Sequence, residues 1–132
     1  MLLLASLLFG CKKEKTPNGL NEPFSGTWEY EKHIGFFTDS LPPGNGRILD
    51  LSTNGIFESR QHDTVLFKGV YEIKQKTDCS PREQTLFFST NDTAFARDGY
   101  IAIKNGRLTL STSNCLTDGG TTFYRRVGAS RY

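Results

Sequence analysis

Short segments of alternating apolar and polar residues recur along this chain, and turn-forming residues separate them. Such alternation is typical of strands that bury one face. No segment predicts a crossover helix, which parallel neighbours would need. The pattern therefore predicts an all-β fold whose antiparallel strands are joined by hairpins. The eight predicted strands span residues 26–32, 47–52, 56–60, 64–74, 86–89, 100–104, 107–111 and 121–127.

Two glycines refine this pattern. Asn105-Gly106 joins two predicted strands and favours a type I′ turn, because both central residues of that turn need a positive φ. Gly69 lies inside the predicted strand 64–74, where an interior glycine indicates a bulge.

Eight antiparallel strands can form an up-and-down barrel or a sandwich, and closure into a barrel removes the exposed edges. An eight-stranded barrel has room for side chains or for one small ligand. Large side chains dominate the predicted inward face, so a filled interior is an alternative to a ligand cavity. The inward residues that we consider as ligand-facing are Tyr30, Phe57, Phe67, Tyr71 and Phe88.

Composition supports one domain without a nucleic-acid partner. The chain has 132 residues, of which 36% are hydrophobic, which is enough for a single core and argues against wholesale disorder. Its 16 basic and 14 acidic side chains give a formal net charge of +2, too small to indicate nucleic-acid binding.

The first ten residues, MLLLASLLFG, carry no charge, and Cys11 follows them. This run is too short to span a bilayer but matches the apolar region of a secretory signal. Leu8-Phe9-Gly10-Cys11 resembles the bacterial lipobox, in which the cysteine is diacylated and the chain is cut before it. We predict a signal peptide over residues 1–10 and lipid attachment at Cys11. The basic region that usually begins such a signal is missing, so we expect the signal to be truncated at its start. The alternative is a hydrophobic N-terminus beside a chance cysteine.

Lipid attachment would fix the location of the protein. Acyl chains on Cys11 give a stable membrane anchor, residues 11–24 form a flexible tether, and residues 25–128 form the barrel domain. The sequence Lys12-Lys13-Glu14-Lys15 lacks the acidic run associated with surface export. We therefore expect a cell-envelope lipoprotein that faces the periplasm. We place its anchor in the outer membrane, and the inner membrane is the alternative.

Several motifs in order resemble one family. Gly26-Thr27-Trp28 is similar to the Gly-x-Trp signature of lipocalins and other calycins. The chain also resembles the lipocalin-like lipoproteins of Bacteroidetes, a likeness that covers roughly residues 24–128 and implies an eight-stranded calycin barrel without implying a ligand. It further implies that Arg126 or Arg125 packs over Trp28; the alternative is a solvated arginine. The stretches that carry the family resemblance are residues 43–46, 52–55, 68–73 and 114–120, with 124–127 after them.

Cys79 and Cys115 remain once Cys11 is lipidated. An even pair in an exported protein predicts a disulfide. However, the strand order of an up-and-down barrel puts the two loops that carry them at opposite ends, so two free thiols are the alternative.

The sequence contains no motif of a known catalytic site, and we predict a protein that is not an enzyme and has no metal or cofactor. His33 and His62 lack metal-ligand spacing, and the carboxylates Asp50 and Glu58 fall on the outward face. The leading function is a binding module for a small apolar ligand. The alternative is an envelope interaction protein whose core is filled and whose loops make the contacts.

Three sites share the order aspartate, hydroxyl residue, aliphatic residue. They resemble the acceptor motif for protein O-glycosylation in Bacteroidetes, and they lie in loops or at loop edges. The alternative is that Asp-Ser and Asp-Thr are simply common turn residues. The hydroxyl residues concerned are Ser40, Thr64 and Thr93.

Overall fold

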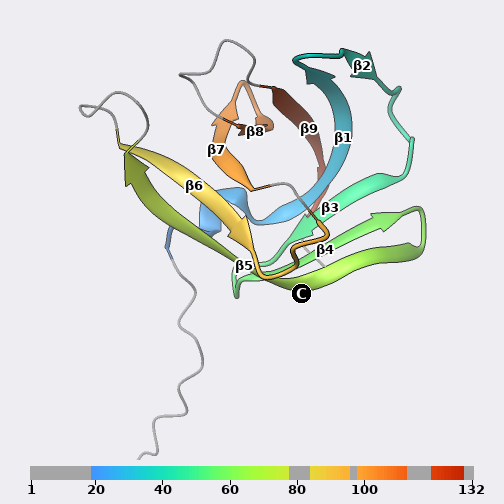
Figure 1. Ribbon diagram of the computed structural model, residues 1–132. Helices are drawn as coiled ribbons and strands as arrows, with labels where there is room; N and C mark the ends of the chain where they lie inside the picture. Colours follow the sequence, from blue (N-terminus) through green and yellow to red (C-terminus); the bar gives the residue numbers. More distant parts are fainter. Residues whose placement is uncertain (1–18, 78–83, 96–97, 113–119, 130–132) are drawn as a thin grey trace, which may run out of the picture.

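The computed structural model describes residues 19–77, 84–95, 98–112 and 120–129. Within these residues, eight antiparallel strands form a closed up-and-down barrel, because each strand pairs with the next and β9 pairs back to β1 (Figure 1). The predicted fold class is confirmed, and the sandwich is excluded. The strands are β1 Gly26–Ile34, β2 Asp39–Ser40, β3 Arg47–Leu51, β4 Ile56–Gln61, β5 Thr64–Thr77, β6 Gln84–Thr90, β7 Gly99–Lys104, β8 Arg107–Ser111 and β9 Thr121–Gly128.

β2 was not predicted and does not belong to the barrel wall. It pairs with the end of β1 through Lys32↔Ser40 and His33↔Asp39. Two residues are too few to show alternation, so the sequence predicted only a loop here. The type I′ turn was predicted correctly, since φ is 54° at Asn105 and 74° at Gly106.

The interior is packed with large side chains, which is the alternative that the sequence left open beside a ligand cavity. Trp28, Phe57 and Phe88 are completely buried, and the Tyr71 and Phe88 rings lie 5.5 Å apart. Burial raises the pKa of the Tyr71 phenol well above its ordinary value, and the charge of Asp50 adds to the effect. Tyr71 therefore stays neutral and donates a hydrogen bond to the Ser52 carbonyl.

A short 3₁₀ helix, Glu22–Phe24, closes one end of the barrel. Phe24 is buried, and its carbonyl accepts a hydrogen bond of 2.8 Å from the Trp28 indole nitrogen. Asn21 is buried as well. The predicted tether over residues 11–24 is therefore too long at its C-terminal end, because the buried indole N–H recruits the preceding chain as its acceptor.

Asp50 and Glu58 lie on the outward face of the sheet but are not solvated, contrary to the simple expectation from alternation. Their exposed fractions are 0% and 2%. One Arg60 nitrogen lies 3.8 Å from Asp50 and 3.3 Å from Glu58, and the Thr27 hydroxyl donates to Asp50 at 2.8 Å. Opposite charge and hydrogen bonding compensate for the desolvation of these carboxylates.

We predict that Arg60→Met destabilises the fold by about 3–5 kcal/mol, because it removes the cation shared by two buried carboxylates. Urea unfolding measures the loss. The matched control is Lys74→Met, since Lys74 and Glu72 form an ion pair whose side chains are 68% and 57% exposed. The control should change stability by less than about 0.5 kcal/mol. Equal effects of the two substitutions would contradict the prediction.

Candidate functional site

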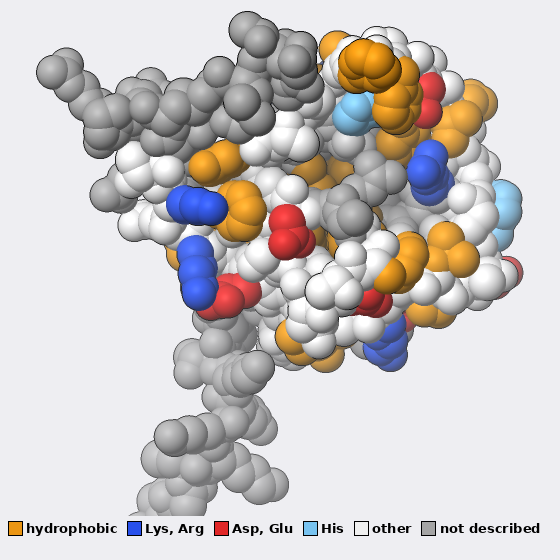
Figure 2. All heavy atoms as spheres, in the orientation of Figure 1, with side chains coloured by type: hydrophobic (Ala, Val, Ile, Leu, Met, Phe, Trp, Pro, Cys, Tyr) orange, Lys and Arg blue, Asp and Glu red, His pale blue; other side chains and the backbone are white. Residues whose placement is uncertain are grey.

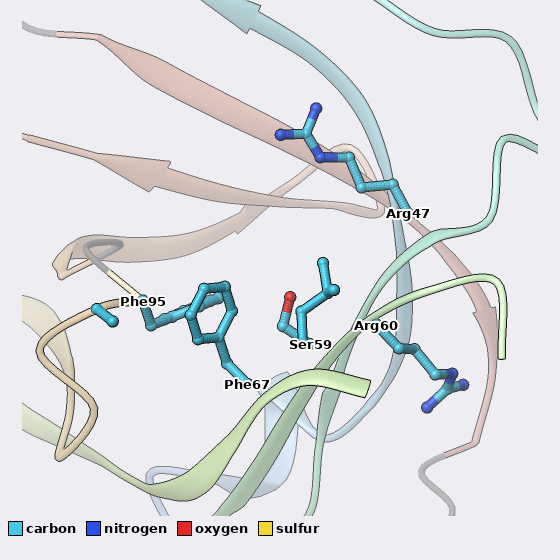
Figure 3. Close-up of a pocket in the computed structure, with 7 residues that line it drawn as sticks. Arg47, Ser59, Arg60, Phe67 and Phe95 are labelled. Atoms are coloured by element: carbon cyan, nitrogen blue, oxygen red, sulfur yellow. The ribbon is translucent and has the colours of Figure 1, made fainter. Parts of the chain in front are cut away.

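The barrel end opposite Phe24 holds a partly open cavity of about 420 Å³ (Figure 3). We call it the mouth cavity. Strands β3, β4 and β5 and the segment after β6 supply its walls. The residues that line it are Arg47, Ser59, Arg60, Leu66, Phe67, Ala94 and Phe95.

A bulge in β5 shapes one wall of the mouth cavity. Ser59 pairs with Phe67 and Arg60 pairs with Val65, so Leu66 is an extra residue on β5. The extra residue breaks the alternation and lets the neighbours Leu66 and Phe67 both line the cavity. The bulge was predicted at Gly69, where instead the Val70 amide donates to the Asn91 side chain at 3.0 Å.

Phe95 forms the aromatic floor of the mouth cavity. Its ring centroid lies 5.0 Å from that of Phe57 and 5.7 Å from that of Phe67. A turn centred on Asp92 directs the chain inward, because the Ala94 amide donates to the Asp92 carboxylate and the Phe95 amide donates to the Asp92 carbonyl. Sequence reasoning missed Phe95, since it lies in a loop without alternation.

Arg47 supplies a cation at the rim of the mouth cavity. Its guanidinium lies 4.5 Å over the Tyr30 ring, and it forms no ion pair with the residues that the structure describes. The Tyr30 hydroxyl is itself bonded to Asp39. In Figure 3 the Arg60 side chain runs away from Phe67 and Phe95, so Arg47 is the arginine that can reach a bound molecule.

Of the five predicted ligand-facing residues, Phe67 lines the mouth cavity. The other four belong to the packed core and are at most 5% exposed. The predicted set therefore marks the barrel interior, but four of its members do not line the mouth cavity, because alternation cannot distinguish a packed position from an open one. The four core residues are Tyr30, Phe57, Tyr71 and Phe88.

The structure places Arg126, rather than Arg125, over Trp28. The Arg126 guanidinium lies 4.3 Å from the indole ring, and its nitrogens donate to the carbonyls of Ser25 at 2.7 Å and Pro23 at 3.3 Å. Gly26 has a φ of +144°, and a Cβ there would lie 2.6 Å from an Arg126 nitrogen. Arg125 contacts Glu29 instead, at 3.4 Å.

The three predicted glycosylation residues are exposed. Ser40 lies in β2, Thr64 begins β5, and Thr93 lies in the segment after β6. An enzyme could reach each hydroxyl, and their modification stays a prediction.

The three cysteines, Cys11, Cys79 and Cys115, lie outside the described residues. His33 contacts the Thr122 hydroxyl at 3.0 Å, and His62 occupies the turn between β4 and β5. The described part of the chain contains no cluster of three potential metal ligands and no helix long and apolar enough to cross a membrane.

Comparisons of this chain with protein-family models, with curated proteins and with solved structures found no match.

We predict that Arg126→Ala lowers the free energy of unfolding by about 1–2 kcal/mol, through loss of the ring contact and of two hydrogen bonds to carbonyls. Trp28 is the single tryptophan of the chain, so its fluorescence reports on this site directly. Arg126→Lys is the control, because it keeps the charge but cannot reach both carbonyls, and its effect should be intermediate. Unchanged emission and stability in Arg126→Ala would contradict the prediction.

Proposed function

We propose that this chain is a lipid-anchored, lipocalin-like protein of the cell envelope. In this proposal its barrel binds a small molecule at the mouth cavity rather than deep in its interior. The observation that carries the proposal is the cavity itself, whose volume of about 420 Å³ falls within the range of about 300–1,000 Å³ typical of small-molecule sites. The packed core supports a site at the rim, because the side chains of Trp28, Phe57 and Phe88 are completely buried.

The lining of the mouth cavity favours a ligand with an aromatic or apolar body and one acidic group. Phe67 and Phe95 offer ring surfaces, and Leu66 adds an aliphatic edge. Arg47 offers the free donors of a guanidinium, which match a carboxylate or sulfonate. Tyr30 positions that guanidinium from below.

We predict that 1-naphthoate binds at this site and that Arg47→Ala weakens its binding about ten-fold, the equivalent of one charge-assisted hydrogen bond. The neutral analogue 1-naphthalenemethanol should bind equally to both proteins. Isothermal titration calorimetry measures each affinity.

Two further variants serve as controls for the naphthoate experiment. Ala94→Trp should fill the mouth cavity and abolish binding of both compounds. Lys74→Ala, which removes one exposed positive charge elsewhere on β5, should leave both affinities unchanged. Equal loss of naphthoate binding in Arg47→Ala and Lys74→Ala would indicate general electrostatics and would overturn the proposed site.

The alternative function is an interaction protein that acts through its loops. A specific observation favours it: Phe36 is 96% exposed and Phe37 is 62% exposed between β1 and β2. Figure 2 shows hydrophobic side chains gathered on the rim formed by this part of the molecule. Under this alternative, cells that carry Arg47→Ala or Ala94→Trp should behave like the wild type. Cells that carry Phe36→Ser should show the same phenotype as cells from which the protein has been deleted.

We predict that Cys11→Ser converts the protein from membrane-bound to soluble when it is expressed, with a basic region added before Met1, in a bacterium with a lipoprotein pathway. Loss of the acyl chains removes the buried methylenes that hold the anchor, each worth about 0.8 kcal/mol. Fractionation and intact mass spectrometry measure the change, with Ser6→Cys in the Cys11→Ser background testing whether any nearby cysteine suffices. Membrane retention of Cys11→Ser would refute lipid anchoring at this residue.

A further inference from the structure

The barrel wall is incomplete between β6 and β7. Three residue pairs join these strands, of which Leu86↔Ile101 is the last. In contrast, β5 and β6 remain paired as far as Thr77↔Gln84. The ribbon of β5 and β6 thus leaves the wall at Leu86, and Figure 1 shows it extending away from β7. Within the described chain, residues 102–104 of β7 have no strand on that side.

A cavity of about 370 Å³ runs along this free edge of β7. We call the cavity and the edge together the β7 slot. Because no strand covers this edge, an inward-facing side chain is exposed there. Ile103 is 38% exposed, although its cross-strand partner Leu108 is completely buried. The residues that line the slot come from both faces of the sheet and are Phe24, Leu86, Tyr100, Ile101, Ala102, Ile103, Lys104 and Ser111.

The free edge identifies the class of molecule that fits the slot. The ladder between β6 and β7 ends at Ile101, so residues 102–104 have no ladder partner on the side that faces β6. Outside the strand ladders, no backbone hydrogen bond joins these three residues to any described residue. An extended peptide satisfies the amide and carbonyl groups of such an edge while its side chains fill the adjacent cavity. A small apolar molecule could fill the cavity but has no groups that form hydrogen bonds with the edge.

The register of β6 predicts which side chains the peptide needs. A strand that continues the β6 ladder would place successive residues opposite Lys104, Ile103 and Ala102. Directly opposite residues share a face of the sheet. The residue opposite Ile103 therefore points inward, toward Leu86 and Phe24, and must be apolar. The residue opposite Lys104 points outward, and an acidic side chain suits it because Lys104 forms no ion pair among the described residues.

We propose that the β7 slot binds an extended peptide segment of a partner protein in the order acidic, apolar, small, as an added antiparallel strand. This site lies at the end of the barrel that Phe24 closes, so it is independent of the mouth cavity and of the function proposed above.

The test uses the peptide acetyl-Ser-Thr-Glu-Leu-Thr-amide and the ¹⁵N-labelled full chain. Binding should shift the amide resonances of residues 101–104. Replacing the peptide leucine by serine should weaken binding at least ten-fold. N-methylation of the backbone at Glu, Leu and the final Thr should weaken it as much. If the N-methylated peptide binds as tightly as the parent, the slot binds apolar side chains without backbone hydrogen bonds, and the proposal is overturned.

Protein variants test the same register. Ile103→Glu should abolish binding, whereas Val127→Glu, at an apolar residue that is 50% exposed on β9, should not. Lys104→Glu should weaken binding of the parent peptide and restore it for a peptide with Lys in place of Glu, which keeps the test valid even if Ile103→Glu fails to fold. Sedimentation velocity supplies the last check: a dimer that Ile103→Glu dissociates would assign the edge to a second copy and overturn the partner-peptide proposal.

Discussion

The fold depends on β1, because this strand makes the contacts that close the barrel. Its first half pairs with β3, and residues 27–34 pair with β9 across two register shifts. Trp28 lies in this first half and anchors three otherwise separate pieces of chain. Its ring packs under Arg126 of β9, and its indole nitrogen bonds to Phe24 of the 3₁₀ helix. Gly26 leaves the space that Arg126 needs. One aromatic residue thus ties together the first strand, the last strand and the incoming chain.

The fold was predictable because apolar and polar residues alternate along most of the barrel strands, which bury one face. The range 107–111 matches β8 completely, and Asn105-Gly106 gives the turn before it. β5 is longer than predicted, since its last residues from Gln75 to Thr77 pair with β6 but are exposed and show no alternation. Local sequence cannot reveal a ribbon that is stabilised by its partner strand outside the core.

The site was much less predictable than the fold. Phe67 was predicted to point inward from the alternation of its strand. Phe95 could not be predicted as a cavity residue, because it lies in a loop and reaches the cavity only through tertiary contacts such as that with Phe67. The burial of Asp50 and Glu58 was missed for a related reason. Alternation assigns each to the outward face, but whether another part of the molecule covers that face depends on contacts distant in sequence, such as Arg60 with Asp50. A β-bulge at Leu66 likewise depends on the partner strand β4.

The position of the 3₁₀ helix has a mechanical consequence. Force applied to the barrel through the chain before Gly19 would first load the Asn21–Thr53 hydrogen bond and then the contacts of Phe24 and Pro23 with Trp28 and Arg126. These contacts lie at the closed end of the barrel, whereas the mouth cavity lies at the other end. Tension on the N-terminal segment would therefore be borne by the seam between β1 and β9 before it could deform the mouth cavity, so the mouth cavity is mechanically insulated from a pull on that segment.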